Sequence, residues 1–174
     1  MKINFWKNHQ SPAFSLLEVI SVLFIVAVGM VGTMSLIIQS IQTGQVNRGN
    51  LIACQLAQEG IELIRGTRDN NWQASQPWLT GLSDGNYKMD YSMATPTPIT
   101  LTSQGVMLFE NNYYRNYHGA ETPNPSLVTG FYRVINLQAS STSTSTLQVQ
   151  SNVSWSDRGK TFTCNLYTLL YDWR

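Results

Sequence analysis

The sequence predicts an α+β protein in which a long N-terminal helix packs on a small C-terminal antiparallel sheet. Three patterns lead to this fold class. An uncharged apolar run fills residues 19–38, helical spacing of apolar residues continues beyond it, and apolar and polar residues alternate in the last third. With 174 residues and a net charge of +1, the chain has room for one modest domain and lacks the overall basic field typical of nucleic-acid binding.

The apolar run is long enough to cross a membrane. As a helix, residues 19–38 would rise about 30 Å, which matches the hydrocarbon core of a bilayer. Lys2 and Lys7 precede the run, and the next basic residue is Arg48. The positive-inside rule therefore places the N-terminus in the cytoplasm and the rest of the chain outside. We expect a transmembrane and assembly helix over residues 14–41.

Glu18 is a single carboxylate at the start of this apolar run. A carboxylate inside a membrane costs about 2.5–3.5 kcal/mol at mid-bilayer and less near an end, so Glu18 calls for a partner. The polar segment Met1–Ala13 lies before the run and ends in a small residue, whereas the residues after Ile38 do not form a good signal-peptidase site.

This order of polar leader, small residue, glutamate and apolar helix resembles the class III signal of type IV pilins and pseudopilins. The resemblance implies that prepilin peptidase removes the leader 1–13 by cutting between Ala13 and Phe14, and that Phe14 is then N-methylated. Ala13 stands where the family usually has glycine. In the family's filaments the glutamate that matches Glu18 meets the N-terminal amine of a neighbouring subunit, and such a pair offsets the cost of burial. A weaker alternative role is interaction with the helix macrodipole.

An amphipathic helix is expected over residues 42–69 of the globular domain. Arg65 and Arg68 suit its last turn, and residues 69–71 read as its stop. The stretch from Leu56 to Asp69 is similar to the corresponding helix of minor pilins of the pilus-modification type. Gly60 is expected to permit close helix–sheet approach, while Glu59 and Glu62 form either a solvated face or a contact. The apolar positions recur at helical spacing: Val46, Ala53, Ala57, Ile61 and Ile64.

Residues 70–174 are expected to form the antiparallel sheet and loops of the globular domain. The pattern predicts a first strand at 87–91, a middle region with one or two short strands, and three final strands at 131–137, 147–155 and 161–166. Residues 157–160, Asp-Arg-Gly-Lys, read as the hairpin turn between the last two strands. One apolar face of this sheet needs a cover, and the amphipathic helix is the candidate of adequate length.

The chain has two cysteines, Cys54 and Cys164, which lie far apart and form no CxxC motif. Two separately buried thiols are the favoured interpretation, because cysteine often acts as a small buried hydrophobic residue. A disulfide is the alternative hypothesis, since Cys164 falls on the predicted core face, where it could meet Cys54 on the covering helix.

The sequence favours no catalytic, cofactor or metal site. Its only histidines are His9 and His118, so no nucleophile–histidine arrangement is assembled, and Asp84, Asp90, Glu110 and Glu121 lack EF-hand spacing. One cluster of aromatic and basic residues allows a DNA or glycan contact with Arg115 and Arg133 as its cations, although packing on the sheet is the favoured interpretation. The members of the cluster are Tyr113, Tyr114, Arg115, Tyr117 and His118.

Together these patterns lead to the expectation of a minor pilin-like structural subunit, not an enzyme. Its partners would be prepilin peptidase, other pilin subunits, inner-membrane assembly proteins and the membrane itself. It would begin as a single-pass membrane protein and end in an extracytoplasmic pilus or pseudopilus filament. The alternatives are a minor pseudopilin of a type II secretion system, a surface receptor or adhesin with an uncleaved anchor, and a secreted enzyme retaining such an anchor.

Overall fold

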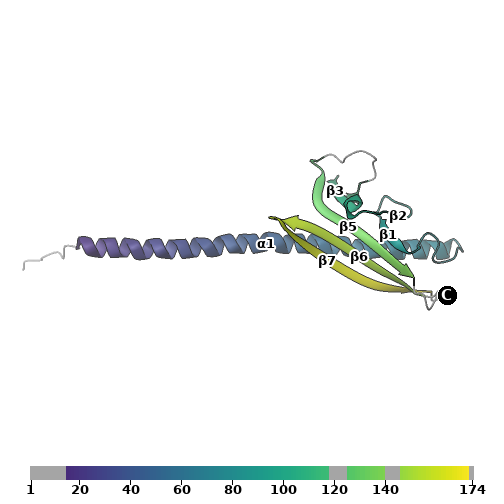
Figure 1. The fold of residues 1–174 in the computed structure, drawn as a ribbon, viewed down its shortest axis with the longest axis horizontal. Coiled ribbons are helices and arrows are strands. Elements are labelled where there is room, and N and C mark those ends of the chain that lie inside the picture. The colour runs from purple at the N-terminus through teal and green to yellow at the C-terminus, as the bar shows by residue number, and fades with distance from the viewer. Residues whose placement is uncertain (1–14, 118–124, 140–145, 173–174) are drawn as a thin grey trace, which may run out of the picture. The chain divides into compact units, whose positions relative to one another are not determined.

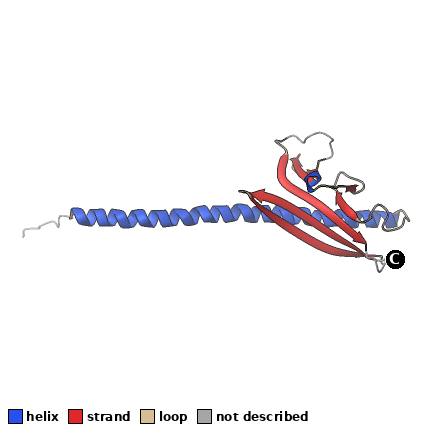
Figure 2. Ribbon diagram, in the orientation of Figure 1, coloured by secondary structure: helices blue, strands red, loops and turns tan. Residues whose placement is uncertain are grey.

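The computed structural model describes residues 15–117, 125–139 and 146–172, so the expectations for Ala13, Phe14 and His118 lie outside the described residues. The chain divides into two compact units, Met1–Gly44 and Gln45–Arg174, which are called here the apolar unit and the sheet unit. Helix α1, Leu16–Gln73, belongs to both. In the sheet unit this helix packs on an antiparallel sheet (Figure 1; helix blue and strands red in Figure 2), which confirms the expected α+β class.

The centre of the sheet is strand β5, Val128–Ala139. Strand β6, Thr146–Asp157, pairs along one edge of β5, and β7, Lys160–Tyr171, pairs with β6. The other edge of β5 is shared, because β3 pairs with its first half and β1 with its second half. All these pairings are antiparallel. The remaining elements are β1 (Gly85–Lys88), β2 (Thr97–Pro98), the 3₁₀ helix η1 (Thr102–Gly105), β3 (Val106–Glu110) and β4 (Tyr113–Asn116).

The core lies between the outer half of α1 and one face of the sheet. Alternate residues of β6 point towards the helix and are buried, as the strand period of two requires. On α1 the buried positions follow helical spacing, as expected for an amphipathic helix. Four of the five expected helix positions, Ala53, Ala57, Ile61 and Ile64, are buried, and Val46 is partly exposed.

The β6–β7 hairpin has the expected turn. Asp157 pairs with Lys160, so the loop consists of Arg158 and Gly159. Both residues have positive φ, 49° and 75°. Two left-handed residues are the conformation of a type I′ turn, whose twist matches that of the flanking strands. This turn sets the register of β6 and β7.

Four features differ from the sequence predictions. Helix α1 ends at Gln73, not at residue 69, and its last turn holds no basic residue, so Arg65 and Arg68 lie before that turn. The first strand is Gly85–Lys88 instead of 87–91. The middle region holds three short strands and a 3₁₀ helix where one or two strands were expected. The final three strands are each longer than predicted, because pairing with neighbours extends them beyond their clearest alternation.

Candidate assembly helix and the buried arginine of the sheet unit

The apolar unit presents an exposed aliphatic surface with one acidic group near its start. Leu16, Phe24 and Val31 are 80%, 68% and 69% exposed. An 18-residue window of α1 has a mean hydropathy of 2.4 and none of it is buried, so this part of the helix is long and apolar enough to cross a membrane. An exposed surface of this kind needs a lipid or protein environment to cover it.

Glu18 lies in the first turn of α1, and Ser15 immediately precedes the helix. The spacing Ser-x-x-Glu is that of a capping box, in which the glutamate would bond back to the backbone. Among the described residues, however, the Glu18 carboxylate makes no hydrogen bond or ion pair; the contact at this turn is the backbone bond from Glu18 N to Ser15 O at 3.0 Å. Its carboxylate therefore has no internal role that the described part of the chain accounts for.

The nearest polar side chain along the helix, Ser21, is satisfied locally. Its hydroxyl donates to the backbone oxygens of Leu17 and Glu18, at 2.8 and 2.9 Å. Thr33 and Ser35 bond in the same way to carbonyls three or four residues earlier. Because these hydroxyls bond to their own helix, they leave no unpaired donor on the apolar surface. Glu18 is the exception in this stretch.

The sheet unit contains a fully buried arginine that the sequence analysis treated as a surface cation. Arg133 lies on the inner face of β5 and is 0% exposed. Its Nη1 donates to Glu59 Oε2 at 2.8 Å and to the Leu56 carbonyl at 2.9 Å, both on α1, and its Nη2 donates to the Met89 carbonyl. One side chain thus joins the central strand to the helix and to the segment after β1.

Burial lowers the pKa of Arg133 below its ordinary value, while the charge of Glu59 and the hydrogen bond to it act in the opposite direction. The guanidinium nevertheless stays charged at neutral pH, as arginine does in proteins. Its charge is therefore held in the core by Glu59, whose side chain is 33% exposed, and by two backbone carbonyls. Of the two interpretations left open for Glu59, the packing contact is the one observed.

Asp90 lies next to this network and is also fully buried. Its Oδ1 accepts bonds from the Ser92 backbone and hydroxyl at 2.9 and 2.7 Å, and its Oδ2 accepts one from the Asn116 backbone at 2.6 Å. Asp90 also contributes a favourable charge interaction to Arg133. These bonds fix the loop after β1 against β4, which positions the Met89 carbonyl for the arginine.

Gly60 allows the helix to approach the sheet at this point. A Cβ atom there would lie 2.5 Å from Ser151 Oγ and 3.3 Å from Arg133 Cδ. Contacts below 3.0 Å force a neighbour to move, so a larger residue would push the helix from the sheet. The expected close approach is confirmed. Ser151 is 0% exposed, and its hydroxyl has no hydrogen-bond partner among the described residues.

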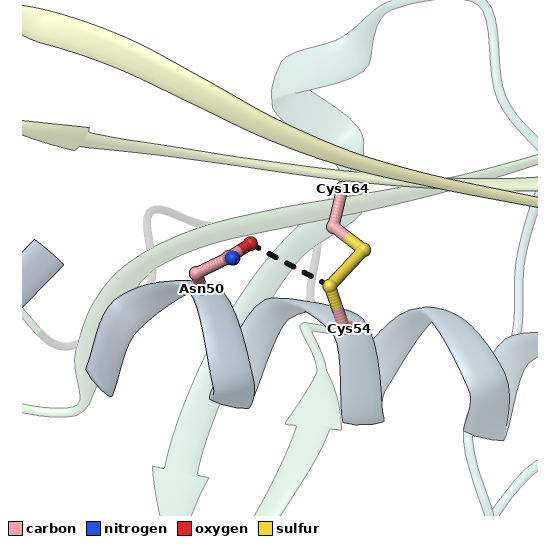
Figure 3. The surroundings of a disulfide bond; sticks show 3 residues. All are labelled: Asn50, Cys54 and Cys164. Carbon is pink, nitrogen blue, oxygen red and sulfur yellow. Dashed lines mark hydrogen bonds between the residues drawn. A yellow bond between two sulfur atoms is a disulfide. The ribbon is translucent and has the colours of Figure 1, made fainter. Parts of the chain in front are cut away.

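Cys54 and Cys164 form a disulfide between α1 and β7 (Figure 3), with a Cα–Cα distance of 5.4 Å. The favoured interpretation of two separate thiols is therefore wrong. The cause is the register of the sheet, which places Cys164 opposite Val153 on the face covered by the helix. Asn50 lies one turn before Cys54, with Oδ1 3.5 Å from its Sγ. The bridge closes a sequence separation of 110 residues.

Within the aromatic and basic cluster, Tyr114 packs on the sheet as the favoured interpretation expects, whereas Tyr113 is 62% exposed. Tyr114 lies between Phe109 and Phe131, with ring centroids 5.0 and 6.2 Å away. Arg115 forms an ion pair with Glu110. Arg133, the second cation of the DNA hypothesis, is buried and does not belong to that surface, so that part of the hypothesis is wrong. A DNA or glycan contact by the rest of the cluster stays a hypothesis.

The described residues include no group of three His, Cys, Asp or Glu side chains arranged to hold a metal ion. Asp84 serves the fold instead, since its Oδ1 accepts a bond from the Ala139 backbone at 2.5 Å. Glu62, the other helix carboxylate left open, pairs with Arg65 at 2.6 Å across an exposed turn. No family model, no curated protein and no solved structure matches the chain.

Proposed function

We propose that this protein is a minor pilin-like structural subunit that prepilin peptidase processes between Ala13 and Phe14 and that enters or primes a type IV pilus filament. The observation that carries the proposal is Glu18, a carboxylate without an internal partner in the described chain, set in the first turn of an exposed apolar helix. Such a group is costly in a membrane unless a cation meets it. In the proposed filament that cation is the amine of Phe14 in a neighbouring subunit.

The sheet unit supports a structural role. Its helix and sheet are joined by a disulfide, a buried arginine and a close glycine contact. A rigid unit carried by an apolar helix suits a subunit that is stored in the membrane and then packed against copies or relatives of itself. The fold is the long-helix and antiparallel-sheet arrangement that the pilin resemblance implies.

Intact-mass analysis of the membrane-purified protein tests the processing step. Coexpression with the prepilin peptidase of the source organism should remove Met1–Ala13 and add one methyl group to Phe14. An uncut chain would contradict the proposal and favour a receptor or adhesin that keeps its N-terminal anchor. Ala13→Lys should block the cut, which controls for cleavage by other peptidases.

Glu18→Ala tests the pairing step separately. Processing should continue, because Glu18 lies beyond the bond that is cut, but recovery in sheared filaments should fall at least about tenfold for the loss of a pair in low dielectric. Ser21→Ala is the matched control, since its hydroxyl bonds only to its own helix. Equal recovery of Glu18→Ala and the wild type would refute the intersubunit pair.

A further inference from the structure

The outward face of the three long strands has a neutral, hydrogen-bonding surface. Strand register and burial place the even-numbered residues of β5 and β6 and the odd-numbered residues of β7 on the face opposite α1. None of these positions holds Asp, Glu, Lys or Arg, and all three strands lie within the described residues. The face consists mainly of amide, hydroxyl and tyrosine side chains. In Figure 1 these strands are the three long arrows labelled β5, β6 and β7.

This face is hollowed where β1, β5 and β6 meet. The hollow has a volume of about 500 Å³ and lies within the size range of small-molecule sites. Three hydroxyl side chains and Val134 complete its lining. Five amide side chains from three strands line it: Asn86, Asn136, Gln138, Gln150 and Asn152. So many amides around one hollow provide donors and acceptors together, without any fixed charge.

Two bonds hold this lining in place. Asn136 Nδ2 donates to Asn86 Oδ1 at 2.9 Å, and Gln150 Nε2 donates to the Tyr167 hydroxyl at 3.2 Å. The four residues lie in one row across β1, β5, β6 and β7. Each bond uses only one polar atom of an amide that has an oxygen and an NH₂ group. The row is therefore pre-ordered and keeps hydrogen-bonding capacity for a ligand.

A second hollow continues from one end of the amide hollow. This second hollow has a volume of about 340 Å³, is lined by Tyr132 and by hydroxyl residues, and shares Ser154 and Thr102 with the first. The ring of Trp155, which also borders it, is 6% exposed and packs in the core on the helix side. From Gln150 to Ser156, the β6 residues along the two hollows span roughly 20 Å of strand. The surface therefore offers an elongated track, with amides at one end and Tyr132 among hydroxyl residues at the other.

We propose that this track is a binding site for a neutral oligosaccharide. Sugar hydroxyls donate and accept hydrogen bonds at once, as amides and hydroxyls do, and the apolar faces of sugar rings suit aromatic side chains. Nucleic acids and acidic glycans fit poorly, because their binding relies on cations and the three long strands place none on this face. Lys88, on the same face of β1, donates to the Tyr117 carbonyl. A protein partner fits less well, because protein interfaces have an apolar, aromatic centre, whereas the centre of this track is formed by amides.

The test uses the full chain in polyoxyethylene detergent micelles, which contain no sugar headgroup. Cellohexaose, maltohexaose and chitohexaose are titrated and followed by NMR, with heparin hexasaccharide and hexagalacturonate as charged probes. At least one neutral probe should bind at low millimolar concentration or better, and the charged probes should not. Failure of all three neutral probes, or a preference for the charged ones, would overturn the proposal and leave protein contact as the use of this face.

Two glutamines on β6 provide a matched pair of variants. Gln150 lines the hollow, whereas Gln148 lies two residues earlier on the same face and outside it. Gln150→Ala should weaken binding about fivefold, as expected for one lost hydrogen bond, while Gln148→Ala should leave it unchanged. Circular dichroism and an unchanged unfolding midpoint establish that both variants fold. Equal weakening by the two variants would place any binding elsewhere and refute the site.

Discussion

Arg133 of β5 and Glu59 of α1 meet across the core, with Nη1 and Oε2 2.8 Å apart. The arginine is fully buried, and the glutamate keeps access to water at the edge of the helix. Removing Glu59 would leave Arg133 without the partner of its ion pair, with only the weaker charge interaction of Asp90 and backbone carbonyls around the guanidinium. This pair therefore makes the packing of helix on sheet depend on one charge.

Glu59→Leu should lower the free energy of unfolding by about 3 kcal/mol, because it leaves Arg133 charged in the core. The double variant Glu59→Leu, Arg133→Met should lose less than Glu59→Leu alone, since it removes both charges and keeps apolar volume. Urea unfolding of the full chain in nonionic micelles, followed by tryptophan fluorescence, measures both. A double variant less stable than Glu59→Leu would contradict the argument.

Glu62→Leu is the control for this prediction. Glu62 pairs with Arg65 three residues later on the same helix, and the two side chains are 51% and 39% exposed. An exposed pair of this kind contributes little, so the change in stability should stay within about 0.5 kcal/mol. A loss as large as that of Glu59→Leu would mean that general helix effects, not the buried pair, decide the result.

Gly60→Ala should destabilise the sheet unit by about 1–3 kcal/mol, because its Cβ would lie 2.5 Å from Ser151 Oγ and the helix must move. Gly66→Ala, at a helix position with nothing within 4 Å, should instead stabilise by about 0.5–1 kcal/mol through helix propensity. The same urea titration compares the two. Equal effects at both positions would rule out the steric explanation.

Ser151→Ala should partly rescue Gly60→Ala. The Ser151 hydroxyl has no hydrogen-bond partner among the described residues, so its removal opens space without breaking a bond. Rescue should be incomplete, because Arg133 Cδ and Ile135 Cδ1 would still lie 3.3 and 3.4 Å from the new Cβ. Strictly additive losses in the double variant would show that the two side chains do not compete for the same space.

The hairpin turn offers a backbone test. Gly159 has a φ of 75°, where a Cβ atom is strained, so Gly159→Ala should cost about 1–2 kcal/mol. Asparagine tolerates this conformation better, and Gly159→Asn should therefore cost less than Gly159→Ala. Thermal unfolding monitored by circular dichroism distinguishes them. The reverse order of stability would argue against a left-handed residue at this position.

The sequence predicted the elements whose pattern is local. The long apolar run, the helical spacing around Ala57 and the Asp-Arg-Gly-Lys turn each carry their signal within a few residues, and the structure confirms the fold built from them. The predicted end of the helix was wrong, because tertiary burial of the residues after it overrides their weak helix propensity. Trp72 is buried, and Asn71 Nδ2 donates to the carbonyls of Trp78 and Thr80, so the helix continues past its expected stop.

Arg133 was missed although a local signal for it exists. Phe131, Ile135 and Leu137 are buried, and strict alternation puts Arg133 on their face. This alternation predicts that the Arg133 charge lies in the core, and a buried charge in turn predicts a carboxylate partner on the covering helix. What no local pattern supplies is the choice of Glu59 over Glu62, because that depends on how the helix is rotated and translated over the sheet.

The position of the helix over the sheet, which no local pattern predicts, also explains why the disulfide stayed one of two hypotheses at the sequence level.

Removing the disulfide should cost about 2–5 kcal/mol of folding stability, because the bridge constrains a long loop in the unfolded chain. The double variant Cys54→Ser, Cys164→Ser should therefore have a lower unfolding midpoint than the wild type when the full chain is unfolded in micelles. A reducing agent should lower the unfolding midpoint of the wild type by the same amount and leave that of the double variant unchanged. Thiol titration of the unreduced, denatured wild type should find no free thiol. Two titratable thiols would contradict the bridge, and a reductant effect on the double variant would show that the loss has another source.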